Sequence, residues 1–261
     1  MKSIQLPEPL RILFNKHFIH PIQERLPEDI YLTGYPKSGN TWLEHMLFGL
    51  VYGADMRFVP DKLVKMIFPD VNYSHIYFRI NNFTIFKTHN QPDPSIKRAI
   101  QIVRDGRDCM ASFYAMNKSL KMNPNWHDMI IDGKGLLGYP KWHIYLKKWI
   151  ENPYNTNILW IKYEDLLLNP LLEANKIVRF LEIERSDDVI RTAVESTCFT
   201  EMSRKENTMG WFNQNWDRNE KFVRKGVRGS YKREIPPEYV EHFEHEAKEI
   251  LKHFGYLEQR D

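Results

Sequence analysis

The stretch GYPKSGNT, which begins at Gly34, has residue types and a spacing that suit phosphate binding. Gly34 and Gly39 are spaced as in the nucleotide-triphosphatase loop G-x-x-x-x-G-K-[ST], and Thr41 takes its Ser/Thr position. Asn40 stands where that loop has its lysine, which here lies inside the loop as Lys37. A lysine in this place suits a donor with one phosphate beside the transferred group, because it can stabilise charge on the bridging oxygen.

The same loop offers several kinds of hydrogen-bond donor to an anion. Backbone N–H groups in such a loop converge on an anion, and the helix expected after it adds the positive end of its dipole. Ser38, Asn40 and Thr41 add side-chain donors, and Gly39 permits a close approach. The alternative is an ordinary strand-to-helix turn, in which Gly and Ser are common.

A second charged turn, VRDGRD, follows an apolar segment. Arg104 lies at the end of that segment, and Ser112 comes eight residues later, near the start of the next expected helix. A planar guanidinium and a hydroxyl together suit a second anion site. The alternative is that the charges of this turn only pair with one another at the surface. These charges are Arg104, Asp105, Arg107 and Asp108.

A basic loop near the C-terminus reads RKGVRGSYKRE. Gly226 and Gly229 allow it to bend, and a basic loop with glycine hinges suits a phosphate carried on a sugar. Taken alone, a basic run is more often a solvated surface. Its basic residues are Arg224, Lys225, Arg228, Lys232 and Arg233.

Apolar segments and helical patterns alternate along the chain, and they predict the elements that position these loops. The expected strands are 30–34, 83–88, 99–103 and 157–163, and the expected helices are 40–53, 107–120, 140–152, 169–183, 186–197 and 236–256. Because the strands are almost continuously apolar, they are typical of a parallel sheet buried on both faces. The predicted fold class is therefore α/β, with a P-loop-like doubly wound sheet, mostly parallel, flanked by helices on both faces.

Ligands of doubly wound sheets bind at the carboxyl ends of the strands. Three segments with reactive side chains, 34–42, 87–90 and 104–112, follow expected strands and should meet at that edge. No Gly/Ser-rich linker divides the chain, so residues 1–261 are expected to form a single domain.

Composition narrows the classes of partner. The net charge of +3, from 37 basic and 34 acidic residues, suits a small anionic ligand but falls short of a nucleic-acid footprint. The two cysteines form no C-x-x-C pair, which predicts packed thiols and no metal site. The sequence shows neither a secretory segment nor a run of about 18 apolar residues. A cytoplasmic protein without a membrane span is therefore expected.

Taken together, these motifs resemble those of the PAPS-dependent sulfotransferases, specifically their cytosolic-type branch. The family has a YPKSG-T-W loop, a K-T-H strand end, an R-[DN]-x-x-D turn with a downstream Ser, a late YED and an RKG-x-x-G loop. This sequence has all of them in the family order and spread over most of the chain. They are YPKSGNTW (35–42), KTH (87–89), VRDGRDCMAS (103–112), YEDLLLNP (163–170), TCFTEM (197–202) and FVRKGVRG (222–229).

The resemblance implies a sulfuryl donor, 3′-phosphoadenosine 5′-phosphosulfate (PAPS), and the product 3′-phosphoadenosine 5′-phosphate (PAP), without a metal. It implies that the 5′-phosphate is held by Lys37, Ser38, Gly39, Asn40 and Thr41. It implies that the 3′-phosphate is held by Arg104, Ser112, Arg224, Lys225 and Gly226. Around the adenine it places Trp42, Tyr163, Thr197, Phe199 and Phe222.

The resemblance also implies a catalytic role for three residues. His89 would be the general base that takes a proton from the acceptor, since an ordinary imidazole pKa near 6.5 fits this task. Lys37 and Lys87 would stabilise charge on the leaving phosphate during a direct, in-line transfer. Taken alone, a histidine at a strand end is more often a structural residue.

The sequence departs from the family pattern at Asn40, where a second Thr is usual, and at GSYK (229–232), where Gly-Asp-Trp-Lys is usual. The second change leaves open whether the chain forms a homodimer. The acceptor is expected to be a small, apolar molecule with a hydroxyl, an alcohol or phenol, or an amine. Its expected wall is Phe113, Tyr114, Met116, Met122, Trp126, Met129, Trp211, Phe212 and Trp216, unless half of these are core.

Two other functional classes are alternatives to a sulfotransferase. A P-loop kinase would use ATP and magnesium, and the missing lysine after Gly39 argues against it. A non-catalytic nucleotide-binding protein would keep the loops and lose the base, and the presence of His89 and Lys37 argues against that.

Overall fold

The computed structural model describes residues 19–210, 223 and 226–257. Within them, the central sheet has the strand order β4-β2-β5-β6, and every neighbouring pair is parallel. A separate antiparallel pair, β1 with β3, lies outside this sheet. The strands are β1 (Ile19–Pro21), β2 (Ile30–Gly34), β3 (Ile76–Phe78), β4 (Ile85–Thr88), β5 (Arg98–Val103) and β6 (Asn157–Lys162).

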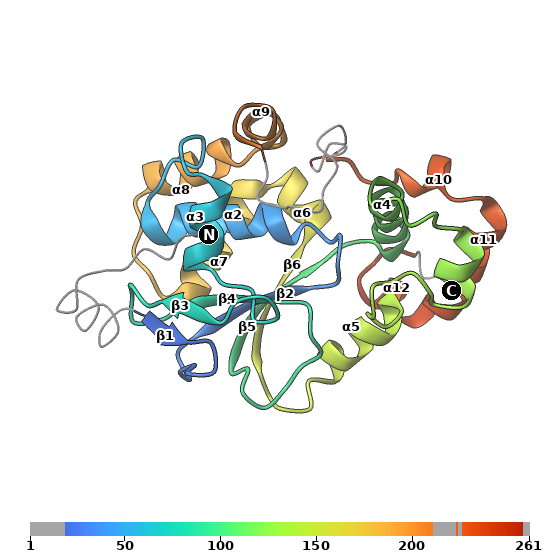
Figure 1. Ribbon diagram of the computed structural model, residues 1–261, viewed down its shortest axis with the longest axis horizontal. Helices are drawn as coiled ribbons and strands as arrows, with labels where there is room; N and C mark the ends of the chain where they lie inside the picture. Colours follow the sequence, from blue (N-terminus) through green and yellow to red (C-terminus); the bar gives the residue numbers. More distant parts are fainter. Residues whose placement is uncertain (1–18, 211–222, 224–225, 258–261) are drawn as a thin grey trace.

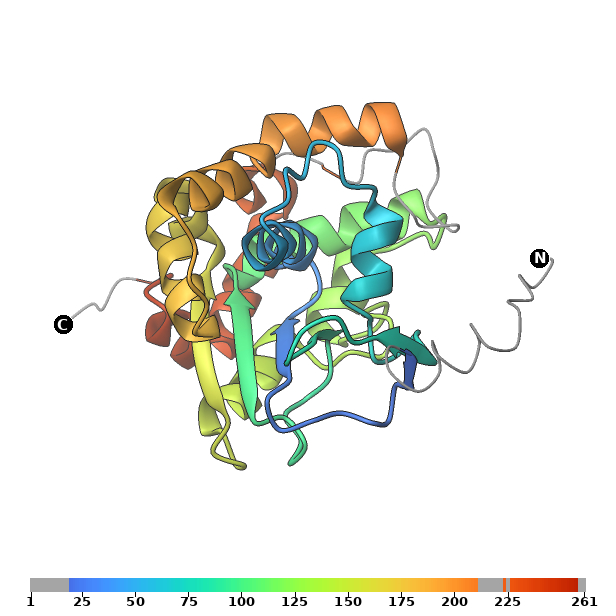
Figure 2. The ribbon, with the colours of Figure 1, turned by 90° about the vertical axis from the view of Figure 1, so that its left-hand side faces the viewer.

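Helices cover both faces of the central sheet (Figure 1). On one side lie α2 (Asn40–Tyr52), α3 (Asp61–Ile67), α6 (Tyr163–Leu168), α7 (Pro170–Leu181), α8 (Asp187–Ser196) and α9 (Phe199–Met209). On the other lie α4 (Gly106–Ser119), the π-helix η1 (His127–Ile131), α5 (Trp142–Glu151), α10 (Tyr231–Glu234), α11 (Pro237–Glu246) and α12 (Lys248–His253). Figure 2 shows α2 (blue) end-on above β2. In this view, α9 (orange) lies horizontally at the top.

The alternation of side chains along the strands creates two separate cores. Ile30 and Leu32 of β2 pack with α2, α7 and α8, whereas Tyr31 packs with α4, α5 and α11. The same alternation in β5 sends Ile100 and Ala99 to opposite faces. The strands are apolar on both faces because both faces are covered, which confirms the predicted α/β class.

The predicted elements of the central sheet and its main helices are confirmed, with boundaries that shift by a few residues. The strand expected at 83–88 begins at Ile85, and the one expected at 157–163 ends before Tyr163, which starts α6. The C-terminal helix expected at 236–256 is wrong in one respect, because it is interrupted at Ala247 between α11 and α12. The sequence analysis missed β1, β3, α3, α6, α9, α10 and η1.

Parallel pairing brings the ends of four strands to one edge of the sheet. Thr33 of β2 pairs with Thr88 of β4, and Gly34 of β2 pairs with Ile102 of β5. The segments after these strands are therefore neighbours, as predicted. No helix of the described part of the chain is both long enough and apolar enough to cross a membrane.

Candidate active site

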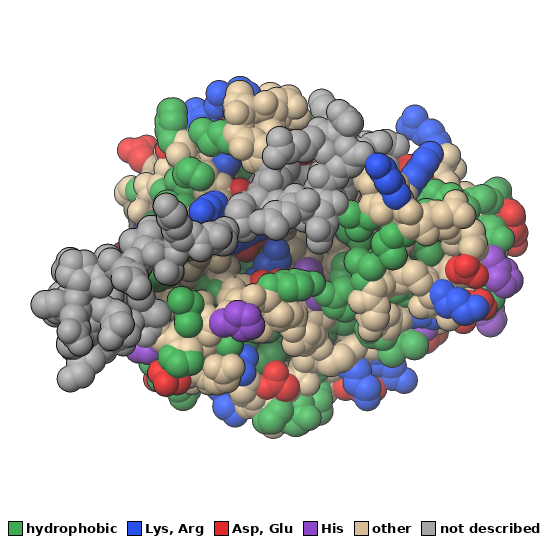
Figure 3. All heavy atoms as spheres, viewed as in Figure 1, with side chains coloured by type: hydrophobic (Ala, Val, Ile, Leu, Met, Phe, Trp, Pro, Cys, Tyr) green, Lys and Arg blue, Asp and Glu red, His purple; other side chains and the backbone are tan. Residues whose placement is uncertain are grey.

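A cavity of about 870 Å³ lies at this edge of the sheet. Figure 3 shows a recess near the middle of one face, with Lys or Arg and His side chains on its floor and hydrophobic side chains beside it. Most of the site residues predicted from the sequence line the cavity. They are Lys37, Gly39, Asn40, Thr41, Trp42, Lys87, His89, Arg104, Ser112, Tyr163, Thr197, Phe199 and Gly226. Ser38 does not line it, and Phe222, Arg224 and Lys225 lie outside the described residues.

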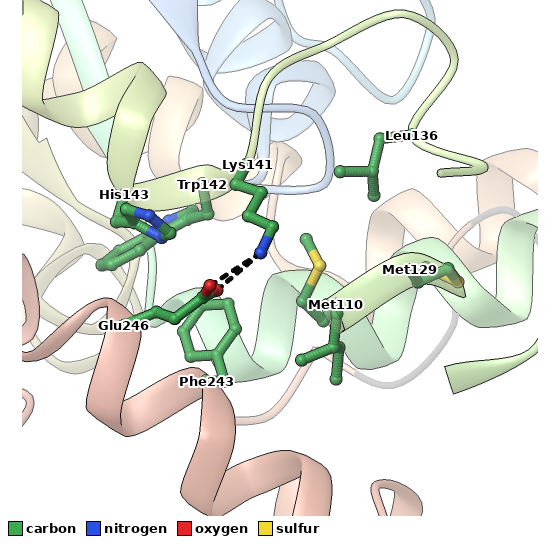
Figure 4. A pocket seen from close by; sticks show the side chains of 9 residues that line it. Met110, Met129, Leu136, Lys141, Trp142, His143, Phe243 and Glu246 are labelled. Atoms are coloured by element: carbon green, nitrogen blue, oxygen red, sulfur yellow. Dashed lines mark hydrogen bonds and ion pairs between the residues drawn. The ribbon is translucent and has the colours of Figure 1, made fainter. Parts of the chain in front are cut away.

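A second cavity, between α4, α5 and α11, has a volume of only about 10 Å³. Figure 4 shows Met110, Trp142 and Phe243 around it, with the ion pair between Lys141 and Glu246 beside it. A space of this size holds about one water molecule. Of these two cavities, only the larger has room for a small-molecule ligand.

The loop before α2 has an unusual backbone conformation at two residues that line the cavity. Lys37 has φ 71° and Gly39 has φ 101°, both in the left-handed region that is uncommon for a residue with a side chain. A Cβ on Gly39 would lie 2.7 Å from the ring of Tyr163, so only glycine fits there. The first turn of α2 has no acidic residue and no side-chain cap, which leaves its N–H groups for an anion.

Two side chains of this loop bond within the protein. Asn40 donates from Nδ2 to the carbonyl oxygen of Tyr35 at 3.0 Å, which closes the loop on itself. The hydroxyl of Ser38 is buried and lies 3.5 Å from the sulfur of Cys109. The backbone N–H of Ser38 also bonds within the protein, since it donates to the carbonyl oxygen of Tyr35 at 3.1 Å. The role of both side chains as phosphate donors stays a prediction.

Arg104 connects the two segments that the sequence predicts to bind anions. Its guanidinium donates to the carbonyl oxygens of Lys37 and Val227, each at 3.2 Å, and lies 4.4 Å from the ring centre of Tyr163. The residue is 8% exposed. The alternative of a purely surface charge cluster is wrong, since Arg107 and Asp105 are buried as well.

Asp108 has a role that the sequence analysis did not assign. Its buried carboxylate accepts hydrogen bonds from the N–H of Gly229 at 2.6 Å, the hydroxyl of Ser230 at 3.2 Å and the N–H of Tyr231 at 3.0 Å. Asp108 therefore ties α4 to the end of the basic C-terminal loop. The second acidic residue of the R-x-x-x-D pattern was the available signal, but the sequence could not name its partners.

Aromatic rings line another part of the cavity. The rings of Trp42 and Tyr163 meet edge to face, with centroids 5.5 Å apart. Phe199 is 41% exposed and contacts Gly226, where a Cβ would lie 2.3 Å from the Phe199 ring. The hydroxyl of Thr197 donates to the carbonyl oxygen of Ala193 at 2.7 Å, so this side chain is held by its own helix.

His89 lies at the end of β4 and is held in one orientation. Its Nδ1 lies 2.7 Å from the carbonyl oxygen of Gly34. A carbonyl can only accept, so Nδ1 carries the proton and Nε2 has a free electron pair. Burial, with contributions from Lys87 and Lys37, lowers the pKa of His89 to about 4. The imidazole is therefore neutral at physiological pH, as a general base must be.

Lys87 lines the cavity two residues before His89 and is paired with a buried carboxylate. Its Nζ donates to Oε2 of Glu44 at 3.3 Å. Burial acts to lower the pKa of Lys87, but Glu44 and Asp70 outweigh it, so the pKa lies above the usual value. Glu44 was not predicted, because no local sequence pattern links it to a lysine 43 residues away.

The acceptor wall predicted from the sequence is only partly found among the described residues. Phe113 and Met129 belong to the core, Tyr114 stacks on Trp126 with centroids 4.0 Å apart, and Met116 alone of this group lines the cavity. Trp211, Phe212 and Trp216 lie outside the described residues. The described apolar lining on this side is Met66, Phe68, Met116, Leu120, Leu137 and Tyr139.

Comparison with known proteins identifies a matching family and several relatives of this chain. The family described as "Sulfotransferase domain" matches residues 27–255. Sulfotransferase 1 family member D1 of Rattus norvegicus is 26% identical over 246 residues, which cover 85% of this chain and 82% of the relative.

Two solved structures share the fold. Retinol dehydratase in complex with androsterone and inactive cofactor PAP has a TM-score of 0.65 and 18% identity, covering 87% of this chain and 81% of its own. Mouse sulfotransferase SULT7A1 complexed with PAP has a TM-score of 0.63 and 22% identity, covering 87% of this chain and 85% of its own.

Proposed function

Because this chain belongs to the family of sulfotransferase domains, we propose that it transfers a sulfuryl group from PAPS to a small, apolar acceptor. The observation that carries the proposal is the hydrogen bond between His89 and Gly34. It aims a neutral base from the end of β4 into the same cavity that the phosphate loop borders. We also propose that residues 1–261 form one domain, which the family match over residues 27–255 supports.

Donor binding is assigned to the loops around Arg104. The backbone from Lys37 to Thr41 would hold the 5′-phosphate, because the shape of this loop and the start of α2 favour an anion. Arg104 and Ser112 would hold the 3′-phosphate, with the loop at Gly226. The predicted contribution of Arg224 and Lys225 concerns residues outside the described part of the chain.

The adenine is assigned to the aromatic part of the cavity. Trp42, Tyr163 and Phe199 line it together with Thr197. Stacking of a base on such rings is worth about 1–3 kcal/mol. Two structural neighbours are complexed with PAP, which supports a nucleotide as a ligand of this chain.

The reaction would be a direct transfer in which a bond from sulfur to the acceptor's oxygen or nitrogen forms as the S–O bond to the 5′-phosphate breaks. Nε2 of His89 would take the proton of the attacking hydroxyl or amine. Lys37 and Lys87 would stabilise the negative charge that develops on the leaving phosphate. No covalent bond to the protein is required.

The acceptor is assigned to the side of the cavity beyond His89. Met66, Phe68 and Leu137 make this side apolar, and Tyr139 lies against the imidazole with ring centroids 5.7 Å apart. An alcohol or phenol with an apolar body fits such a wall. The androsterone bound by one structural neighbour and the retinol bound in another structure are molecules of this kind.

We expect PAP to bind in the micromolar range or better, with the same affinity in the presence of EDTA. The charges of Lys37 and Arg104 can neutralise the nucleotide phosphates without a metal. Isothermal titration calorimetry with PAP, with and without EDTA, makes the measurement. Absence of PAP binding would overturn the donor assignment, and a loss with EDTA would overturn the metal-free site.

The activity is tested with labelled PAPS and a set of phenols, aliphatic alcohols, sterols, amines and charged polysaccharides. We expect label in at least one apolar hydroxyl compound, and transfer only to charged polysaccharides would contradict the acceptor assignment.

The pKa of His89 predicts a flat pH profile in the neutral range. The base acts in its neutral form, which dominates above its pKa of about 4 and is lost as the pH falls through that value. We therefore expect kcat/KM to change little between about pH 6 and pH 8 and to fall only at lower pH. The measurement is kcat/KM against pH. An acid limb with a midpoint near the ordinary imidazole value of about 6.5 would contradict the buried, neutral His89.

A further inference from the structure

Glu44 is a buried acidic residue in α2 to which the proposed reaction gives no role. Its side chain is 1% exposed, yet it borders the large cavity. One carboxylate oxygen accepts from Lys87, and the other finds no hydrogen-bond partner among the described residues. A carboxylate buried in this way is costly. Among the described residues, the hydrogen bond from Lys87 to its carboxylate offsets this cost.

Lys87 is held firmly at its backbone but depends on Glu44 at its tip. Its N–H donates to Pro69 at 2.9 Å, and its carbonyl accepts from Val71 at 3.0 Å. These bonds fix the backbone of Lys87, but they do not restrict the rotamers of its flexible side chain. Among the described residues, its ammonium donates a hydrogen bond to Glu44. This bond links β4, which carries Lys87, to α2, which carries Glu44.

Other charged groups also face this pair. Asp61 of α3 and Asp70 of the following segment act on Lys87, and His89 directly follows β4, the strand that carries Lys87. Lys65 of α3 acts on Glu44. Among these groups, Glu44 contributes most to keeping Lys87 in its ammonium form.

We propose that Glu44 is a positioning residue for sulfuryl transfer, which holds the ammonium of Lys87 beside the leaving phosphate. The inference rests on the proposed function, in which Lys87 stabilises that phosphate. Glu44 touches no reacting atom and acts only through Lys87. Its removal should lower the rate of the transfer step, while donor binding, which other loops provide, should be retained.

The first test compares wild type with Glu44→Gln, using labelled PAPS and an acceptor that wild type sulfates. We expect kcat to fall about tenfold or more, as small misplacements of catalytic groups do, and the Kd for PAP to stay within about threefold. We also expect the alkaline loss of activity to begin at lower pH, because burial then lowers the pKa of Lys87 without its main counter-charge. Unchanged kcat in Glu44→Gln would overturn the inference.

Glu173→Gln is the matched control. Glu173 is a buried helical glutamate, paired with Lys176 at 2.6 Å, and it does not line the cavity. This variant should keep both kcat and the pH profile of wild type. If wild type itself transfers no label, the proposed function fails, and that result is separate from any effect at Glu44.

A double-mutant comparison tests whether Glu44 acts through Lys87. Lys87→Met should lower kcat, and Glu44→Gln in the Lys87→Met background should lower it no further. The double variant removes both buried charges together, so it keeps the test decisive even if Glu44→Gln alone does not fold. A double variant clearly slower than Lys87→Met would overturn the inference, because Glu44 would then act by another route.

Discussion

Replacing His89 with alanine should lower kcat by about 10²–10⁴-fold, the usual contribution of a general base. The reason is geometric, since the bond from Nδ1 to Gly34 leaves Nε2 as the basic atom that points into the cavity. The neighbouring Lys37 and Lys87 are cations and cannot take over as a base near neutral pH. Donor binding depends on other segments, so the Kd for PAP should change little. Labelled PAPS gives kcat, and calorimetry gives the Kd.

Two further variants separate loss of the base from loss of structure. His89→Gln can still donate to the Gly34 carbonyl but has no basic nitrogen, so it should be as slow as His89→Ala. His143→Ala removes a histidine that borders the small cavity and whose pKa is also lowered by burial. It should keep wild-type turnover. Wild-type kcat in His89→Ala or His89→Gln would show that the base is another group.

Replacing Arg104 with alanine should weaken PAP binding by about 100-fold. Arg104 would contact the 3′-phosphate directly, and it joins the segment at Lys37 to the segment at Val227. A charge-assisted hydrogen bond is worth about 1.5–3 kcal/mol, and about 1.4 kcal/mol corresponds to a factor of ten in affinity. Calorimetry with PAP checks the loss, and thermal unfolding without ligand reports any loss of stability.

The matched control for Arg104 lies at the other end of the same strand. Arg98 begins β5 and donates to the Phe180 carbonyl, away from the cavity. Arg98→Ala should leave PAP affinity unchanged. Arg104→Lys keeps the charge but loses the planar fork that reaches both carbonyls, so its affinity should lie between wild type and Arg104→Ala. Equal PAP affinity in wild type and Arg104→Ala would remove Arg104 from the donor site.

Local patterns predicted the elements around the site well. The Gly spacing from Gly34 to Gly39, followed by an amphipathic run, predicted β2, the turn and α2, and all three are present. The apolar segment before Arg104 predicted β5 and α4 in the same way. Such elements depend on neighbours in the chain, so a short window of sequence carries the information.

Local patterns did not predict which apolar side chains line the cavity. Phe113 and Met116 stand three positions apart on α4, yet Phe113 is in the core and Met116 lines the cavity. The residue type cannot distinguish these two outcomes, because an apolar side chain suits both a packed core and an apolar cavity wall. The apolar wall at Met66 and Phe68 was missed since α3 has no motif that marks it.

The sequence by itself determined the α/β class, the family and the segments that meet at the cavity, because each of these follows from residues close together in the chain. Only the tertiary structure decided how the side chains are held. His89 is oriented by a carbonyl 55 residues away, Lys87 by Glu44 at a separation of 43, and the C-terminal loop by Asp108 at separations of 121 to 123. These contacts arise when parallel strands and their helices pack together. Their partners therefore depend on the whole fold rather than on any local pattern.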